Sequence, residues 1–226
     1  MKVIRDIRIY RNNIENVDGN SLPSSFDNKE LCITIYRIAL KLEEQGFSMG
    51  DFHHLYINLT TCDVEDMIAP ANRSKDRYYP WYRYYDVHIT RELYDSLESK
   101  KCIKEVVSLL EQVLEKFFST EFFDKELIHS CVAAAVDEGE EMLVKYKEKK
   151  SSKNRAIIYL RYLDNGNFYP LLRVFDLEEN LIFEKDMPEA TELLAYGDIQ
   201  LSTKKIVIKP RKNFFTKDDE PMSFLF

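Results

Sequence analysis

Apolar and polar positions change their spacing twice in the first third of the chain. Val3–Arg11 alternates apolar with charged residues, which is typical of a strand with one solvent-exposed face. Over Leu31–Leu42 the apolar residues recur at helical spacing, with Asp27 as a candidate N-cap and Gly46 as a candidate C-terminal glycine. Alternation returns at His53–Thr60. This region therefore predicts strand, helix and strand.

The middle of the chain predicts one more strand followed by helices. Trp81–Ile89 is rich in aromatic residues, which favour a pleated surface. Thr90 is placed to cap a short helix after that strand. Helical spacing then covers Ile103–Phe117 and a second run that begins after Asp124 and continues to Tyr146.

The last third returns to strands joined by tight turns. An Asn-Gly turn joins Ala156–Leu163 to Phe168–Phe175, and a short strand follows at Leu181–Phe183. Asp198–Leu201 and Lys205–Lys209 predict a second hairpin. Successive strands with such short connections form an antiparallel meander.

Together these elements predict an α+β fold. We expect an antiparallel β-sheet, made of the C-terminal meander and the N-terminal strands, packed against a layer of three to four helices. The 226 residues suffice for one domain, and we expect a single domain over 1–226, with 147–154 as a possible subdivision. Residues 12–25 predict a loop, and the apolar residues after 221 predict a C-terminus that docks.

Composition narrows the class of protein. Apolar residues make up 45% of the chain and charged residues 31%, which is typical of a globular protein. The N-terminus is charged, and no apolar run approaches the roughly 18–20 residues of a membrane span. The four cysteines, at 32, 62, 102 and 131, form no closely spaced pair. We therefore expect reduced, mostly buried thiols and a cytoplasmic protein that makes no membrane contact.

The net charge of the chain indicates which kinds of partner to expect. A net charge of −7 disfavours nucleic acid, whose phosphates are met by clustered Lys and Arg. It suits a basic protein partner, and it also suits ordinary solubility. The chain has one basic cluster, Lys204–Lys212. It permits a weaker hypothesis, in which the chain is a nucleic-acid accessory protein. Alternatively, these lysines protect the edge of a strand from aggregation.

The segment from Arg77 to Tyr85 carries the most informative pattern, with six aromatic residues among the eight from Tyr78 onward. Tyr, Trp and Arg dominate protein interfaces because they combine a large contact area with a polar group. Alternation on a strand would place two sets of side chains on opposite faces: Trp81, Arg83 and Tyr85 on one face, and Tyr82, Tyr84 and Asp86 on the other. We expect one of these two faces to lie in the core.

From this segment we predict a partner-binding site formed by Arg77, Tyr79, Trp81, Arg83 and Tyr85. Burial in the core remains an alternative for these side chains, as does binding of a small ligand or single-stranded nucleic acid.

A second candidate surface is acidic. Asp137, Glu138 and Glu141 fall on the predicted helix, where Asp137 and Glu141 are one turn apart. Such a run is either a solvated helix face or a patch that meets a basic partner. We include these three residues in the predicted partner-binding site.

No motif indicates a reaction. His53, His54, His88 and Asp86 could gather at strand ends as an acid–base site, but they lack metal-ligand spacing. Cys62 and Cys131 have no catalytic signature around them. The sequence thus predicts no catalytic residue, metal or cofactor.

The sequence favours a non-enzymatic protein-binding module. An immunity-type or antitoxin-type inhibitor of a bacterial partner protein is one concrete form of that hypothesis. The alternative is an enzyme that uses the histidine and aspartate residues at the strand ends.

Overall fold

The computed structural model describes residues 1–12, 24–72 and 77–226, and the chain divides into two compact units, Met1–Gly139 and Glu140–Phe226. Each unit has its own sheets and its own core. The predicted α+β class is confirmed. Within the described ranges, no helix has the length and apolar character needed to cross a membrane. The loop predicted at 12–25 lies largely outside the described residues.

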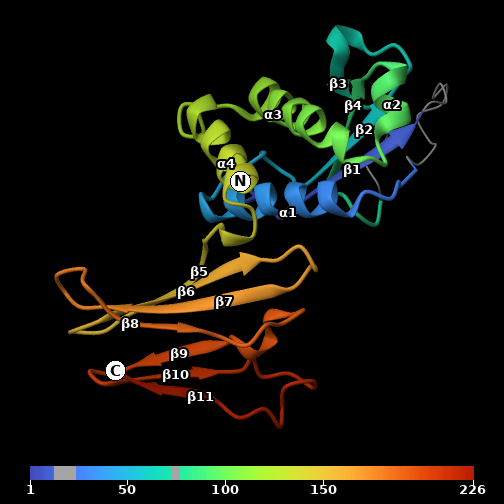
Figure 1. Cartoon of the computed structure of the whole chain (residues 1–226). Helices are drawn as coiled ribbons and strands as arrows, with labels where there is room; N and C mark the ends of the chain where they lie inside the picture. Colours follow the sequence, from blue (N-terminus) through green and yellow to red (C-terminus); the bar gives the residue numbers. More distant parts are fainter. Residues whose placement is uncertain (13–23, 73–76) are drawn as a thin grey trace. The chain divides into compact units, whose positions relative to one another are not determined.

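The first unit contains a four-stranded sheet in the order β1-β2-β4-β3 (Figure 1). Strands β1, β2 and β4 run parallel, and β3 is antiparallel to β4. The bounds are Asp6–Asn12 for β1, His54–Thr60 for β2, Ile68–Pro70 for β3 and Tyr82–His88 for β4.

The parallel pairing corrects the expectation that the N-terminal strands are antiparallel. Helix α1 (Lys29–Glu44) connects β1 to β2, and a helical crossover brings the chain back in the same direction. Strand β3 then runs along the sheet edge, and β4 inserts between β2 and β3. Alternation in the sequence fixes which strands exist, but it does not fix their direction.

Three further helices complete the first unit: α2 (Arg91–Ser96), α3 (Ile103–Phe118) and α4 (Lys125–Asp137). Thr90 and Asp124 cap α2 and α4 as predicted, because their side chains accept hydrogen bonds from backbone N–H groups of the first turn. The cap predicted for α1 is wrong. Asn28, not Asp27, accepts the hydrogen bond from the backbone N–H of Leu31.

Helix α4 also ends earlier than predicted. It stops at Asp137, and Gly139 follows with a φ of +54°, a left-handed conformation that favours glycine. The chain then passes through a short 3₁₀ helix, Gly139–Glu141, into strand β5, Val144–Lys150. The helix predicted to continue to Tyr146 is therefore wrong in its last turns.

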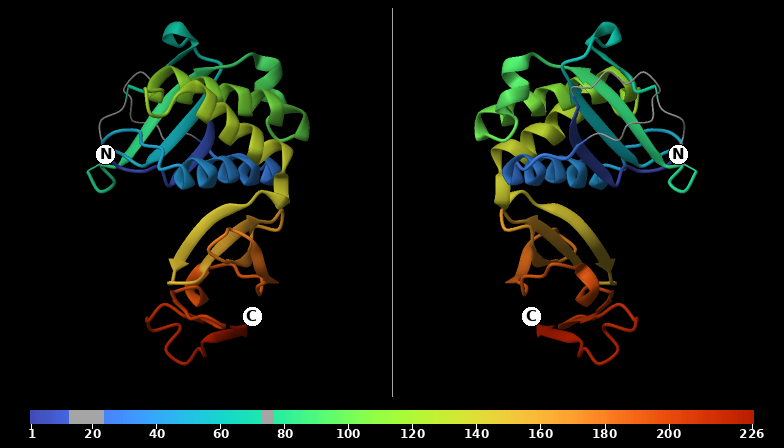
Figure 2. Two further views of the ribbon diagram at one scale, coloured as in Figure 1. Left: turned by 90° about the vertical axis from the view of Figure 1, so that its left-hand side faces the viewer. Right: turned by 90° about the vertical axis from the view of Figure 1, so that its right-hand side faces the viewer.

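The helices of the first unit cover one face of its sheet (Figure 2). From α3, the rings of Phe117 and Phe118 lie 4.8 and 5.5 Å from the ring of Tyr85 on β4. Helix α1 packs on β1, and α4 packs against α1 and α3. Every second residue of the strands points into this core: Ile7, Leu55, Ile57, Leu59 and Val87 are all buried. The opposite face of the sheet carries polar and aromatic side chains.

The second unit contains two antiparallel sheets, of order β5-β6-β7-β8 and β11-β10-β9. The remaining bounds are Arg155–Tyr162 for β6, Phe168–Phe175 for β7, Leu181–Asp186 for β8, Asp198–Leu201 for β9, Lys205–Lys209 for β10 and Met222–Leu225 for β11. The predicted meander and second hairpin are confirmed, and the C-terminus docks as β11 on β10. Strand β10 lies in the middle of its sheet, so its lysines do not protect an edge.

A core between these two sheets holds the second unit together. Its buried members come from both sheets and include Ala156, Ile158, Leu172, Val174, Tyr196, Ile199, Ile206 and Ile208. Burial raises the pKa of Tyr196 to about 12, and its hydroxyl donates to the backbone oxygen of Pro188 at 2.7 Å. The meander is thus covered by a second sheet. The expectation of one sheet shared with the N-terminal strands is wrong.

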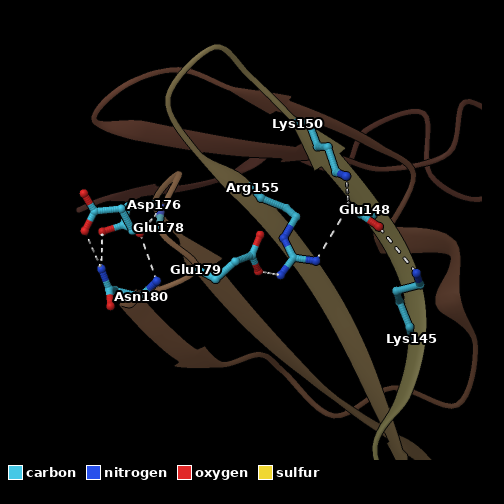
Figure 3. A network of polar contacts seen from close by, with 8 residues as sticks. All are labelled: Lys145, Glu148, Lys150, Arg155, Asp176, Glu178, Glu179 and Asn180. Atoms are coloured by element: carbon cyan, nitrogen blue, oxygen red, sulfur yellow. Dashed lines mark hydrogen bonds and ion pairs between the residues drawn. The ribbon is translucent and has the colours of Figure 1, made fainter.

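The outer face of the meander carries paired charges (Figure 3). Glu148 on β5 lies 3.3 Å from Lys150 and 3.4 Å from Lys145, and Arg155 pairs with both Glu148 and Glu179. Burial alone would raise the pKa of Glu148, but the hydrogen bonds from Lys150 and Lys145 lower it. Acidic and basic residues balance in the second unit, so the net charge of −7 arises from the first.

The possible subdivision at 147–154 falls on β5 and the turn after it, inside the second unit. Structurally, the chain divides a few residues earlier, at Gly139. That the two units work as a single domain stays a prediction.

Candidate functional site

The register of the parallel strands aligns polar and aromatic side chains on the face of the first sheet opposite the helices. Residues that pair across neighbouring strands point to the same face. Two such rows run across β1, β2 and β4: Asp6–His54–Tyr82 and Arg8–Tyr56–Tyr84.

Ring contacts join these rows into one cluster. The ring of Tyr56 lies at its centre, with centroid distances of 4.8 Å to Tyr82, 5.2 Å to Tyr84 and 5.6 Å to Tyr10. The Arg8 guanidinium lies over the same ring, 5.6 Å from its centroid. Tyr56 is only 3% exposed, so it supports the rings around it.

Two stacked pairs extend the cluster beyond the start of β4. Tyr79 stacks on Tyr82 with centroids 5.0 Å apart and planes 2° apart, and Trp81 stacks on His53 at 5.9 Å. Tyr79 is 48% exposed. We call this cluster the aromatic surface; it comprises Tyr10, His53, His54, Tyr56, Tyr79, Trp81, Tyr82 and Tyr84.

The two histidines of this surface interact with each other. The Nδ1 atoms of His53 and His54 are hydrogen-bonded, which requires at least one imidazole to be neutral. Burial, helped by the positive charge of Arg5, lowers the pKa of His53. Burial also lowers the pKa of His54, although Asp6 opposes this effect. Both rings therefore favour the neutral form.

The residues predicted from Arg77 to Tyr85 fall on different sides of β4. Arg83 pairs with Asp51 at 2.9 Å, and Tyr85 packs against α3, so both lie on the helix-covered side. Trp81 and Tyr79 belong to the aromatic surface, and Arg77 is exposed before β4. The other set on the strand, which includes Tyr82 and Tyr84, faces away from the helices.

Part of the aromatic surface was not predicted from the sequence. Tyr10, Tyr56 and His54 come from strands β1 and β2, far from the aromatic segment in the chain. The sequence feature that marks these residues is that each lies on the face of an alternating strand that points away from the core. The register that brings them beside Tyr82 depends on the parallel pairing.

The three acidic residues of the predicted site do not share one helix. Asp137 ends α4, Glu138 follows it as the C-cap, and Glu141 ends the 3₁₀ helix that begins at Gly139. All three are exposed. Because α4 ends before residue 141, the helical one-turn spacing predicted for Asp137 and Glu141 is wrong.

The acid–base site considered from the sequence does not assemble. His54 pairs with Tyr82 and Thr60 pairs with His88, so His54 and His88 stand at opposite ends of two parallel strands. Six residues of strand separate them, which is roughly 20 Å. Asp86 accepts a hydrogen bond from Asn58 at 2.8 Å, and His88 Nδ1 contacts the backbone oxygen of Cys62 at 2.8 Å.

His88 also lines a cavity of about 530 Å³ between β4 and α3. Its lining combines apolar and charged side chains, including Ile68, Val87, Leu109, Glu115, Lys116 and Lys125. Both lysines of the lining make polar contacts: Lys116 donates to the backbone oxygen of Ile68 at 3.0 Å, and Lys125 pairs with Glu115 at 3.2 Å.

All four cysteines are free thiols. Cys102 and Cys131 are buried, and burial raises the pKa of both. A raised pKa disfavours the thiolate, which is the reactive form. Over the ranges that the structure describes, no group of three or more His, Cys, Asp or Glu residues is arranged to hold a metal ion.

No protein-family model matches the chain, and neither a curated protein nor a solved structure shows significant similarity to it. The function is therefore inferred from the aromatic surface itself.

Proposed function

We propose that the chain is a non-enzymatic protein-binding module that contacts its partner through the aromatic surface of the first unit. In its concrete form, the module is a cytoplasmic inhibitor of the immunity or antitoxin type that covers a bacterial partner protein. The observation that carries this proposal is a continuous cluster of tyrosine, tryptophan and histidine rings, which runs from the sheet face opposite the helices to the residues just before β2 and β4.

The packing of the rings favours binding. Immobilising a side chain at an interface costs roughly 0.5–1.5 kcal/mol. Here the buried Tyr56 ring already holds the Tyr82 and Tyr84 rings, and Tyr82 holds Tyr79. Aromatic side chains held before binding lose little further freedom, and they supply the large contact areas found at interface hot spots.

The only tryptophan of the chain provides a direct test. Because Trp81 belongs to the aromatic surface, its fluorescence reports on contacts made there. A partner captured from an extract of the source organism is purified and titrated against the wild-type chain. We expect saturable, one-to-one binding that shifts the Trp81 emission.

Matched variants locate the contact. Tyr78→Ala/Tyr79→Ala removes Tyr79, which is 48% exposed and belongs to the aromatic surface, together with its neighbour Tyr78, which is 78% exposed; the reporter Trp81 is kept. Phe214→Ala/Phe215→Ala removes two exposed rings of the second unit. We expect the first variant to weaken binding by about 2 kcal/mol or more, the lower bound of a hot spot, and the second to have little effect. Equal affinities for wild type and the tyrosine variant would exclude the aromatic surface as the contact.

A further inference from the structure

We propose that the aromatic surface recognises a short acidic segment of the partner protein. This inference rests on the proposed function and adds the chemistry of the contact. It also departs from the expectation of a basic partner, which was drawn from the net charge of the whole chain.

The side chains around the aromatic surface are mainly basic. Lys2, Arg5 and Arg77 are exposed. Arg5 also lies near the Glu43 carboxylate, and its positive charge opposes the rise that burial causes in the pKa of Glu43. Lys2 and Arg5 lie close enough to His53 for their charges to lower its pKa. The one carboxylate in the rows, that of Asp6, accepts a hydrogen bond from Arg8 at 2.7 Å.

The local charge matters more than the net charge once two surfaces touch. Exposed charges beyond a Debye length, about 8 Å at physiological ionic strength, are largely screened. The acidic residues that give the first unit its negative charge include Asp137 and Glu138 at the end of α4, a helix that packs against α1 and α3. Nearer the rings, Asp6 is paired with Arg8 and Asp51 with Arg83, so the positive charges of Lys2, Arg5 and Arg77 remain for a bound segment to meet.

A protein segment fits these charges better than a nucleic acid does. A polyanion extends beyond the basic side chains and meets the acidic remainder of the first unit, which carries the whole net charge of −7. A short peptide with a few carboxylates and one or two apolar side chains contacts only the rings and the basic residues beside them.

Three synthetic peptides of equal length test the proposal. Each peptide of about twelve residues carries the same leucine and phenylalanine residues and no tryptophan, and the remaining positions are glutamate, lysine or serine. Trp81 emission is followed at low and at physiological salt. We expect the glutamate peptide to bind about tenfold more tightly than the other two, and salt to reduce this difference.

A charge-reversal pair separates the local from the overall charge. Lys2→Glu/Arg5→Glu changes the charge beside the aromatic surface, and Lys101→Glu/Lys104→Glu changes it equally at exposed positions around the start of α3. We expect the first variant to lose about tenfold in affinity for the glutamate peptide and the second to keep wild-type affinity.

Each other outcome overturns the proposal in a distinguishable way. If the three peptides bind equally and Tyr78→Ala/Tyr79→Ala abolishes binding, the acidic chemistry fails and the protein-binding function stands. If single-stranded oligothymidylate shifts Trp81 emission at lower concentration than the glutamate peptide, the ligand is a nucleic acid and both proposals fail. If the glutamate peptide produces no shift in Trp81 emission at low salt, the proposal that the aromatic surface binds an acidic segment is also overturned.

Discussion

Asn28 illustrates how a single side chain joins two segments that are distant in the chain. Its Oδ1 accepts from the backbone N–H of Leu31 at 3.1 Å, and its Nδ2 donates to the backbone oxygens of Leu97 at 2.8 Å and Ser99 at 3.1 Å. The residue is 7% exposed. It therefore caps α1 and also fixes the chain after α2.

Replacing Asn28 by alanine should destabilise the first unit strongly. The change removes an N-cap and leaves the buried carbonyl oxygen of Leu97 and the partly buried one of Ser99 without this donor, which together predict a loss of about 2–4 kcal/mol. Urea unfolding followed by circular dichroism measures it. The matched control is Asp27→Ala, for which we expect less than about 0.5 kcal/mol. Equal losses for the two variants would contradict the assignment of the cap.

The histidine pair predicts a stability that depends on pH. The folded-state pKa values of His53 and His54 are lowered, so the unfolded chain binds more protons than the folded chain once the pH falls below about 6.5. Stability should therefore fall from pH 7.5 to pH 5.5. In His53→Gln/His54→Gln the urea midpoint should fall less over this interval. Parallel midpoints for variant and wild type would show that the pair does not contribute.

At the scale of single residues, the sequence predicted those features whose cause is local. Thr90 and Asp124 cap their helices because the hydroxyl or carboxylate reaches a backbone N–H in the next turn. The choice between Asp27 and Asn28 is not local, because it depends on the carbonyl oxygens of Leu97 and Ser99. The same holds for Tyr56, whose ring partners come from two other strands.

Among the secondary-structure elements, the end of α4 depends on one backbone conformation. Gly139 has a φ of +54°, and a Cβ added there would meet no atom closer than 3.9 Å. Gly139→Ala should therefore cost about 1–2 kcal/mol through backbone strain alone. Gly139→Asn should cost less, since asparagine tolerates this conformation. Thermal unfolding compares the two, and a larger loss for asparagine would contradict this explanation.

Strand positions were predictable from alternation, but their partners were not. The meander forms as predicted because each turn is short, and short turns force neighbouring strands to be antiparallel. Strands β1, β2 and β4 have long connections, so their direction and order follow from how α1 and β3 pack. The full aromatic surface could not be predicted from the sequence for the same reason, because it spans all three parallel strands.

For the whole molecule, the division at Gly139 predicts that residues 140–226 fold alone. This segment has its own two sheets and a core between them. The isolated segment should give a dispersed amide NMR spectrum and cooperative unfolding. Within it, Ile206→Ala should cost about 2–5 kcal/mol, because this residue is fully buried. A collapsed spectrum for the wild-type segment would mean that it requires the first unit.

The paired charges of the second unit have a colloidal consequence. Acidic and basic side chains balance there, and several on the outer face of the meander are matched one to one, as in Arg161 with Asp186 and Arg173 with Glu184. A surface with no net charge gives copies little long-range repulsion. The carboxylates of the first unit therefore supply the repulsion that keeps separate molecules apart in concentrated solution.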